Sequence, residues 1–136
     1  MAYAIKAQVG DPRATTFTFA AHKTMYGGKK VSVGDTVFDF ASENEGGHGL
    51  IARGIVTHAA PVAKRRGVER QTPRVSVTIR RTALAKRSLG RSSLKPCSVW
   101  GDGRPETELN FKFYRQATNK LVGISEAASM FLSTFF

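Results

Sequence analysis

The sequence has a single cysteine, Cys97, and only 10 acidic residues against 21 Lys and Arg. One cysteine cannot form a disulfide within the chain, and it excludes a zinc site built from several cysteines. No apolar run is long enough to cross a bilayer, and residues 1–8 alternate and carry Lys6, unlike a secretory signal. We therefore expect a reduced, cytoplasmic protein that does not associate with membranes.

Groups that could support catalysis or hold a cofactor are also scarce. The three histidines lie far apart in the sequence and lack the spacing of metal ligands. The glycine-rich stretch 45–49 is not followed by the Gly-Lys-Ser/Thr of a phosphate-binding loop. Carboxylates are few, and no base neighbours Cys97. The sequence thus predicts a protein that is not an enzyme and uses no metal or other cofactor.

Positive charge is abundant, and it is concentrated in one segment. The net charge is +11, and residues 61–105 hold twelve Lys or Arg side chains against two carboxylates. Nine of the twelve are Arg, whose forked guanidinium matches phosphate oxygens. This pattern favours a nucleic-acid partner, DNA or RNA; the alternative is a basic surface that serves only solubility. The cations expected to contact the phosphates are Lys64, Arg65, Arg66, Arg70, Arg80, Arg81, Lys86, Arg87 and Arg91.

The segment from Lys30 to His58 predicts a β-hairpin. Gly34-Asp35 is a turn pair, and residues 36–40 follow it as a short strand rich in Val and Phe. A polar loop with three glycines, 43–49, separates this strand from a second one, 50–57. The second strand alternates, with Leu50, Ala52, Gly54 and Val56 on one face. We expect this hairpin to be the centre of a β-rich domain.

Alternating apolar residues predict further strands at 3–7 and 74–80, and a basic loop is expected between Ala59 and Pro73. Residues 15–21 favour a strand, although a short helix or an extended cover also fits. A short helical turn or irregular segment is expected within 84–96. Ser125 is the expected N-cap of a closing helix that ends near Thr134. Because no linker is visible, residues 1–136 are expected to form a single domain.

The order of these features resembles the EVE domain, a member of the PUA-like fold group. The resemblance is carried by Gly34-Asp35, the apolar strand ending in Phe40-Ala41-Ser42, the polar loop and the strand 50–57. The basic strand, the leucines after it and the stretch 115–118 before the last helix are similar to the family's later elements, the final strand included. Where the family has Tyr-Trp and Tyr-His-Ser, this chain has Tyr3-Ala4 and Phe40-Ala41-Ser42. The resemblance implies an α+β fold, a PUA-like barrel of about five or six strands with peripheral short helices and a C-terminal helix.

The resemblance also implies a function, the non-enzymatic binding of DNA or RNA with one base, often a modified one, held in a barrel pocket. Such a pocket needs aromatic walls and polar groups that reach the base edge. The residues expected to line it are Phe40, Ser42, Trp100, Phe111, Tyr114, Gln116 and Thr118, with Phe113, Asn110 and Asn119 as further candidates. Two alternatives remain open. One is an ASCH-like RNA-processing or amidohydrolase enzyme that uses lysine with Thr or Glu, and the other is a basic structural protein bound to ribosomal RNA.

Overall fold

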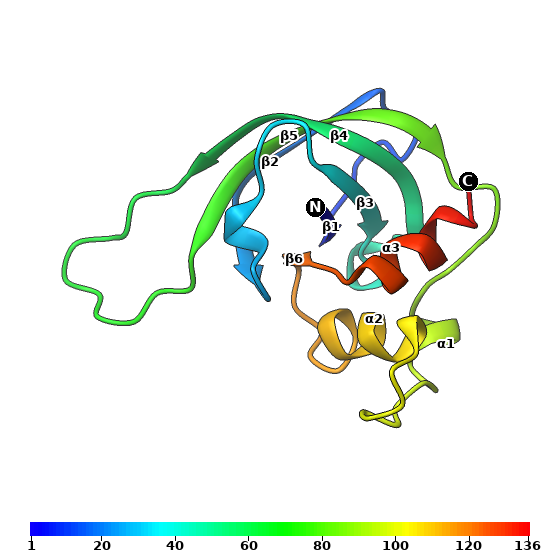
Figure 1. Ribbon diagram of the computed structural model, residues 1–136. Helices are drawn as coiled ribbons and strands as arrows, with labels where there is room; N and C mark the ends of the chain where they lie inside the picture. The colour runs from blue at the N-terminus through cyan, green and yellow to red at the C-terminus, as the bar shows by residue number, and fades with distance from the viewer.

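The computed structural model describes residues 1–136, in which six strands close into a barrel (Figure 1). Around the barrel the order is β1 (Ala2–Ala7), β3 (Thr36–Ala41), β4 (Gly49–Pro61), β5 (Arg74–Leu84), β2 (Thr16–Met25) and β6 (Lys120–Gly123). The pairs β1–β3 and β2–β6 are parallel, and the other four pairs are antiparallel. The predicted barrel of five or six strands is confirmed.

Three short helices accompany the barrel: α1 (Arg91–Leu94), α2 (Pro105–Phe113) and α3 (Glu126–Ser133). Two 3₁₀ turns, η1 (Gly28–Lys30) and η2 (Glu43–Glu45), lie in its loops. The helices gather on one side of the barrel and leave β4 and β5 uncovered on the opposite side (Figure 1). Ser125 caps α3 as predicted, because its hydroxyl accepts a hydrogen bond of 3.1 Å from the Ala128 amide.

The hairpin predicted from the sequence is the pair β3–β4. Gly34 adopts φ +95°, the left-handed conformation that a turn at this place requires. Ala52, Gly54 and Val56, which were predicted to share one face of the strand, are all buried. The pairing shifts between Asp39 and Phe40, so that Phe40 lies opposite Leu50. Because of this shift, Leu50 packs in a different apolar cluster from Val56.

The barrel wall separates two apolar clusters. One fills the barrel interior and includes Ile5, Val37 and Leu121. The other lies between the wall and the helices and includes Phe38 and Val122. Neighbouring residues of one strand therefore enter different clusters, since strand side chains alternate between faces. This explains why β1 and β3 are almost continuously apolar rather than alternating.

Three expectations need correction. The stretch 115–118, expected to resemble a final strand, is an exposed turn, and the strand lies at Lys120–Gly123 instead. Residues 105–113, for which no helix was expected, form α2, with Pro105 in its first turn and Glu106 near its positive end. The basic loop is shorter than expected, since β4 continues to Pro61. The strand favoured for 15–21 is confirmed and extends to Met25.

A carboxyl group lies inside the barrel wall without a partner. Asp39 pairs with Ile5 on β1 and Ala52 on β4, and it shares the inward face of β3 with Val37. Its side chain has no exposed surface, and neither carboxyl oxygen has a hydrogen-bond partner. Burial raises the pKa of Asp39 well above its ordinary value. The group is therefore neutral over a pH range in which an exposed aspartate is ionised.

We expect Asp39→Asn to remove a pH-dependent loss of stability. In the unfolded chain the carboxyl ionises near pH ~3.9, whereas the folded chain retains the proton. Above that pH the native state binds more protons than the unfolded state, so the free energy of unfolding falls as pH rises toward the folded pKa, by at most about 1.4 kcal/mol per unit. Asparagine has a similar shape and cannot ionise, so urea unfolding between about pH 4 and 7 should show a flatter slope. The exposed Asp11→Asn is the matched control, and equal slopes for Asp39→Asn and the parent would contradict the assignment.

Candidate nucleic-acid interface

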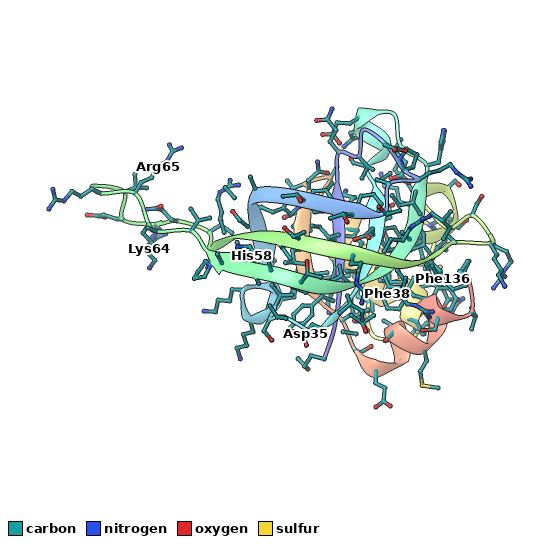
Figure 2. The ribbon with its side chains drawn as sticks, turned by 90° about the horizontal axis from the view of Figure 1, so that it is seen from above. Asp35, Phe38, His58, Lys64, Arg65 and Phe136 are labelled. Atoms are coloured by element: carbon teal, nitrogen blue, oxygen red, sulfur yellow. The ribbon has the colours of Figure 1, made fainter.

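The loop between β4 and β5 extends away from the barrel as a basic arm, residues 62–73 (Figures 1 and 2). The arm carries Lys64, Arg65, Arg66 and Arg70, all of them exposed, against a single carboxylate, that of Glu69. The Gln71 side chain gives the arm a defined shape. Its Oε1 accepts from the Arg65 amide at 2.8 Å, and its Nε2 donates to the carbonyl oxygens of Arg65 at 2.8 Å and Val68 at 3.1 Å. The two sides of the arm are thereby tied together.

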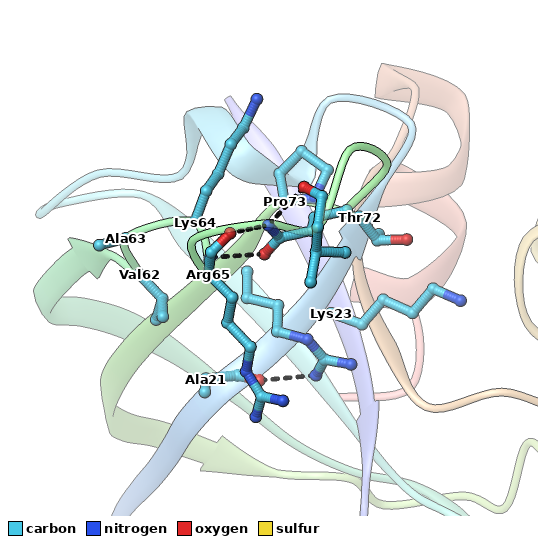
Figure 3. A pocket seen from close by; sticks show the side chains of 11 residues that line it. Ala21, Lys23, Val62, Ala63, Lys64, Arg65, Thr72 and Pro73 are labelled. Carbon is cyan, nitrogen blue, oxygen red and sulfur yellow. Dashed lines mark hydrogen bonds between the residues drawn. The ribbon is translucent and has the colours of Figure 1, made fainter.

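A cleft of about 570 Å³, here called the arm cleft, lies where the arm meets β2 and β5 (Figure 3). Four of its lining residues are cations, Lys23, Lys64, Arg65 and Arg74, and none is acidic. Arg65 extends toward Ala21 (Figure 3). Nη1 of Arg74 donates to the Ala21 carbonyl oxygen at 2.9 Å, which holds a second guanidinium at the same place. The arm cleft is therefore a strongly positive concave surface.

A bulge in β2 shapes the next part of this surface. The pairing of β2 with β5 shifts between Phe19 and His22, and Ala21 adopts φ +48°, which is uncommon for a residue with a Cβ. The Ala21 amide donates to the hydroxyl of Ser76 at 3.0 Å instead of to the strand ladder. Bulges change the direction of neighbouring side chains. Here Phe19 and His22 come to line the same cleft, with ring centroids 5.7 Å apart.

This second cleft, here called the mouth cleft, has a volume of about 420 Å³. Besides Phe19 and His22 it is lined by Gln8 and Asn119, which offer amide groups. It shares Ala21, Lys23 and Arg74 with the arm cleft, so the two clefts form one continuous concave surface. Nε2 of His22 lies 3.1 Å from the carbonyl oxygen of Lys6 and donates to it. Burial, helped by the positive charge of Arg74, lowers the pKa of His22, so the ring is neutral at pH 7.

The residues expected to line a base pocket lie in three separate places. Phe40 and Tyr114 are buried. Phe40 packs on Phe113 at 5.1 Å between centroids, and the Tyr114 hydroxyl donates to Glu43. Ser42 is 2% exposed at the start of η2, and its side chain makes no capping hydrogen bond. These three side chains are buried in this structure, and their place in a base pocket stays a prediction.

The remaining candidates are exposed or half-exposed, and they do not line the arm cleft or the mouth cleft. Trp100 and Phe111 pack edge to face at 5.5 Å and line a small separate cleft of about 270 Å³ beside α2. Gln116 and Thr118 lie in the exposed turn before β6. Of the further candidates, Asn110 is buried and donates to two backbone carbonyls, whereas Asn119 lines the mouth cleft. The sequence thus indicated one mouth-cleft residue and missed Gln8, Phe19, His22 and Lys23.

The cations expected to contact phosphates form two groups. Lys64, Arg65, Arg66 and Arg70 belong to the basic arm. The others lie in the second half of β5 (Arg80 and Arg81), in the segment after it (Lys86 and Arg87) and at the start of α1 (Arg91). Two of these make contacts within the protein. Arg87 donates to the Thr134 carbonyl oxygen at 3.0 Å, and Arg91 donates to Asn44 Oδ1 at 3.1 Å.

Two buried lysines lie beside the turn before β6. Lys6 and Lys120 are each 1% exposed, pair with each other across β1 and β6, and form no ion pair. Nζ of Lys6 donates to the Phe113 carbonyl oxygen at 2.7 Å, and Nζ of Lys120 lies 3.2 Å from the Thr118 hydroxyl. Burial, with the nearby positive charges of Lys6, Lys23 and Arg115, lowers the pKa of Lys120 to about 8. A substantial fraction of Lys120 is therefore a neutral amine close to physiological pH.

A closed mixed barrel of six strands with short helices on one side is the architecture of the PUA-like proteins, and the chain has this fold. Its structure is similar to that of human THYN1 in complex with DNA containing 5-methylcytosine, with a TM-score of 0.64, 13% sequence identity, and coverage of 98% of this chain and 96% of that one. The DUF55 domain of human thymocyte nuclear protein 1 gives a TM-score of 0.64 at 12% identity and 98% coverage of both chains. The fold implied by the resemblance to EVE domains is therefore confirmed.

A bacterial structure extends the likeness. A protein from Pseudomonas putida has a TM-score of 0.64 at 12% identity, with 99% of both chains covered. No protein-family model matches the sequence, and no curated protein matches it. None of the helices is long and apolar enough to span a bilayer.

Proposed function

We propose that the protein binds nucleic acid with the continuous surface of the arm cleft and the mouth cleft. The observation that carries this proposal is the set of four cations, Lys23, Lys64, Arg65 and Arg74, around a cleft with no carboxylate. Because all the charged residues of the lining are positive, the cleft attracts a polyanion. Two of the four cations are guanidinium groups, which are suited to phosphate. The fold shared with a protein crystallised on DNA supports the same proposal.

In this proposal the phosphates lie in the arm cleft and one unstacked base enters the mouth cleft. Phe19 and His22 form an aromatic wall for stacking, and a neutral His22 ring stacks without adding charge. Gln8 offers a donor and an acceptor to the base edge, whereas Asn119 offers its Oδ1 as an acceptor, because its Nδ2 donates to Glu45 at 3.2 Å. Ala7 and Ala20 add apolar surface to the lining, which suits a base with an apolar substituent such as a methyl group. A modified pyrimidine is the base class we propose, by analogy with the 5-methylcytosine of the THYN1 complex.

Replacing Lys64, Arg65 and Arg66 together by Ala should weaken binding to all sequences alike. Each lost phosphate contact reduces the slope of log K against log salt by about 0.7 to 0.9, so three contacts reduce it by about 2 to 3. Fluorescence anisotropy at several salt concentrations gives this slope. Lys95→Ala, an exposed position on the segment after α1, is the control for a general change of charge. An unchanged slope in the triple variant would exclude the arm as the contact surface.

Phe19→Leu should weaken base capture without changing phosphate binding. Stacking of a base on an aromatic ring contributes about 1 to 3 kcal/mol, and leucine retains the packing of Phe19 against the barrel interior. The measurement compares two oligonucleotides that differ at one position, which carries either 5-methylcytosine or an abasic site. The affinity ratio between them should fall about 5- to 100-fold in Phe19→Leu and stay constant in the arm variant. An equal affinity ratio in Phe19→Leu and the parent would contradict base stacking on Phe19. The protein would then bind through charge alone, as a structural RNA-binding protein does.

A second candidate function, hydrolysis of an acyl group, is favoured by the pair Lys120 and Thr118. The Lys120 amine lies 3.2 Å from the Thr118 hydroxyl, and its pKa is lowered to about 8. A neutral amine there accepts the hydroxyl proton while the threonine oxygen attacks an acyl carbonyl. The lysine ammonium then gives that proton to the nitrogen of the leaving amine as the C–N bond breaks and the threonine ester forms. Water would then hydrolyse the threonine ester and release the carboxylic acid. The exposed turn that holds Thr118 makes its hydroxyl accessible to a substrate.

Incubation with an N-acylated nucleoside distinguishes this candidate. If it is correct, deacylation should rise with pH through about 8 as Lys120 loses its proton, and Thr118→Ser should retain activity that Thr118→Ala loses. Product formation is followed by chromatography, with Thr72→Ala on the arm as the matched control. The absence of deacylation by the parent protein at pH 9 would exclude the candidate.

A further inference from the structure

A second basic surface lies at the other end of β5 from the arm. Arg13, His48, Lys86 and Arg87 line a cleft of about 310 Å³ that contains no carboxylate. Arg87 is held in place, because its guanidinium donates to the Thr134 carbonyl oxygen and lies 4.3 Å from the centroid of the Phe135 ring. Arg13 and Lys86 are exposed, and their side chains form no hydrogen bond within the protein. We call these residues, with the exposed Arg80, the far cluster.

The path along β5 between the two basic surfaces is about as long as one repeat of double-stranded nucleic acid. β5 joins them and has 11 residues, from Arg74 beside the arm cleft to Leu84 in the lining of the far cleft. At about 3.4 Å per residue the strand is about 34 Å long. One turn of a B-form duplex advances about 34 to 36 Å. Because β5 is curved (Figure 1), a duplex must follow that curve to present the same groove to the arm and to the far cluster one turn later.

The surface between the two clusters is open and suited to phosphate. The helices lie on the other side of the barrel, and the view from above shows β2, β4 and β5 without a cover (Figures 1 and 2). These three strands contain no Asp or Glu. Side chains on the outward face of β5 alternate with the buried Val75, Val77 and Ile79 and are Arg74, Ser76, Thr78 and Arg80. Hydroxyl and guanidinium groups are the usual partners of phosphate oxygens.

The same surface is unsuited to a single strand. Unpaired bases need aromatic side chains to stack on, and proteins that bind single strands provide such rings along the path. The outward positions of β2 beside this path are Thr16, Thr18 and Ala20, whereas Phe17 is buried and Phe19 lies in the mouth cleft. A duplex keeps its bases stacked and presents only backbone to this surface. The chemistry between the two clusters thus favours paired nucleic acid.

We propose that the protein binds a duplex along β5, with the basic arm and the far cluster holding it one helical turn apart. This proposal rests on the proposed function, and it adds that the substrate is double-stranded and that its full site is about 10 base pairs long. A base in the mouth cleft is then one flipped out of a duplex. DNA and RNA duplexes share the phosphate backbone, so both are included in the test.

The experiment measures the affinity for blunt duplexes of about 12 and about 6 base pairs, just over one turn and half a turn. Three proteins are compared: the parent, the arm variant (Lys64, Arg65 and Arg66 to Ala) and a far variant (Arg13, Arg80 and Lys86 to Ala). In the parent the longer duplex should bind at least about tenfold tighter than the shorter one. Each variant should bind the longer duplex with an affinity close to that for the shorter one. The far variant should also lower the slope of log K against log salt by about 2 to 3.

The other outcomes separate failure of this proposal from failure of the proposed function. If the arm variant weakens binding while the far variant matches the parent in affinity and slope, the nucleic-acid function remains and the duplex site along β5 is refuted. Equal affinity for a single strand of the same length refutes it too. Binding of anionic lipid vesicles that is lost in the far variant, with duplex affinity unchanged, would assign the far cluster to a membrane surface. If the parent binds neither DNA nor RNA at low salt, the proposed function itself is wrong.

Discussion

The barrel closes through the four residues of β6, and the rest of the architecture depends on that closure. Strand β6 pairs with β1 along its whole length and with β2 through only two residue pairs, Thr24–Leu121 and Met25–Val122. The chain segments meet so closely here that side chains are excluded. A Cβ on Gly28 would lie 2.1 Å from the Leu121 carbonyl oxygen, and one on Gly123 would lie 2.6 Å from that of Tyr26. At this narrow closure the Lys6 carbonyl oxygen lies 3.1 Å from His22 Nε2 on β2, and Asn119, just before β6, lines the mouth cleft.

Local patterns predicted the elements whose residues carry their own signal. The hairpin β3–β4 follows from Gly34-Asp35 and from the alternation after it, and α3 follows from Ser125 as its cap. Strand β6 has no such signal, because four residues buried on both faces show no alternation and are held only by distant partners. Helix α2 was missed since its aromatic residues obscured the terminal signals at Pro105 and Glu106. The resemblance to EVE domains supplied the closed topology that these patterns alone do not determine.

The sequence predicted the positive charge of the candidate site but not the positions of the side chains that form it. The sequence places the excess cations in residues 61–105, but only the path of β5 divides them between the arm and the far cluster. Aromatic residues were expected to line a pocket, yet Phe40 and Phe113 pack on each other in the apolar cluster under the helices. Phe19 and His22 line the mouth cleft because of the bulge at Ala21, and a bulge is a property of how two strands pair, which the sequence of one strand does not show. Residue type thus identified the chemistry, while the position of each group depended on long-range pairing.

The Gln71 side chain gives the basic arm a property beyond its charge. Three hydrogen bonds to the backbone of Arg65 and Val68 restrict the loop before any partner arrives. An unrestrained loop of this length would lose conformational entropy on contact, at about 1 to 2 kcal/mol for each residue that becomes fixed. Much of that ordering has already occurred during folding, so more of the electrostatic attraction remains as binding free energy. In the proposed complex the arm therefore meets the nucleic acid with part of its shape already set, and a polyanion whose backbone does not match that shape gains less from the charge of the arm.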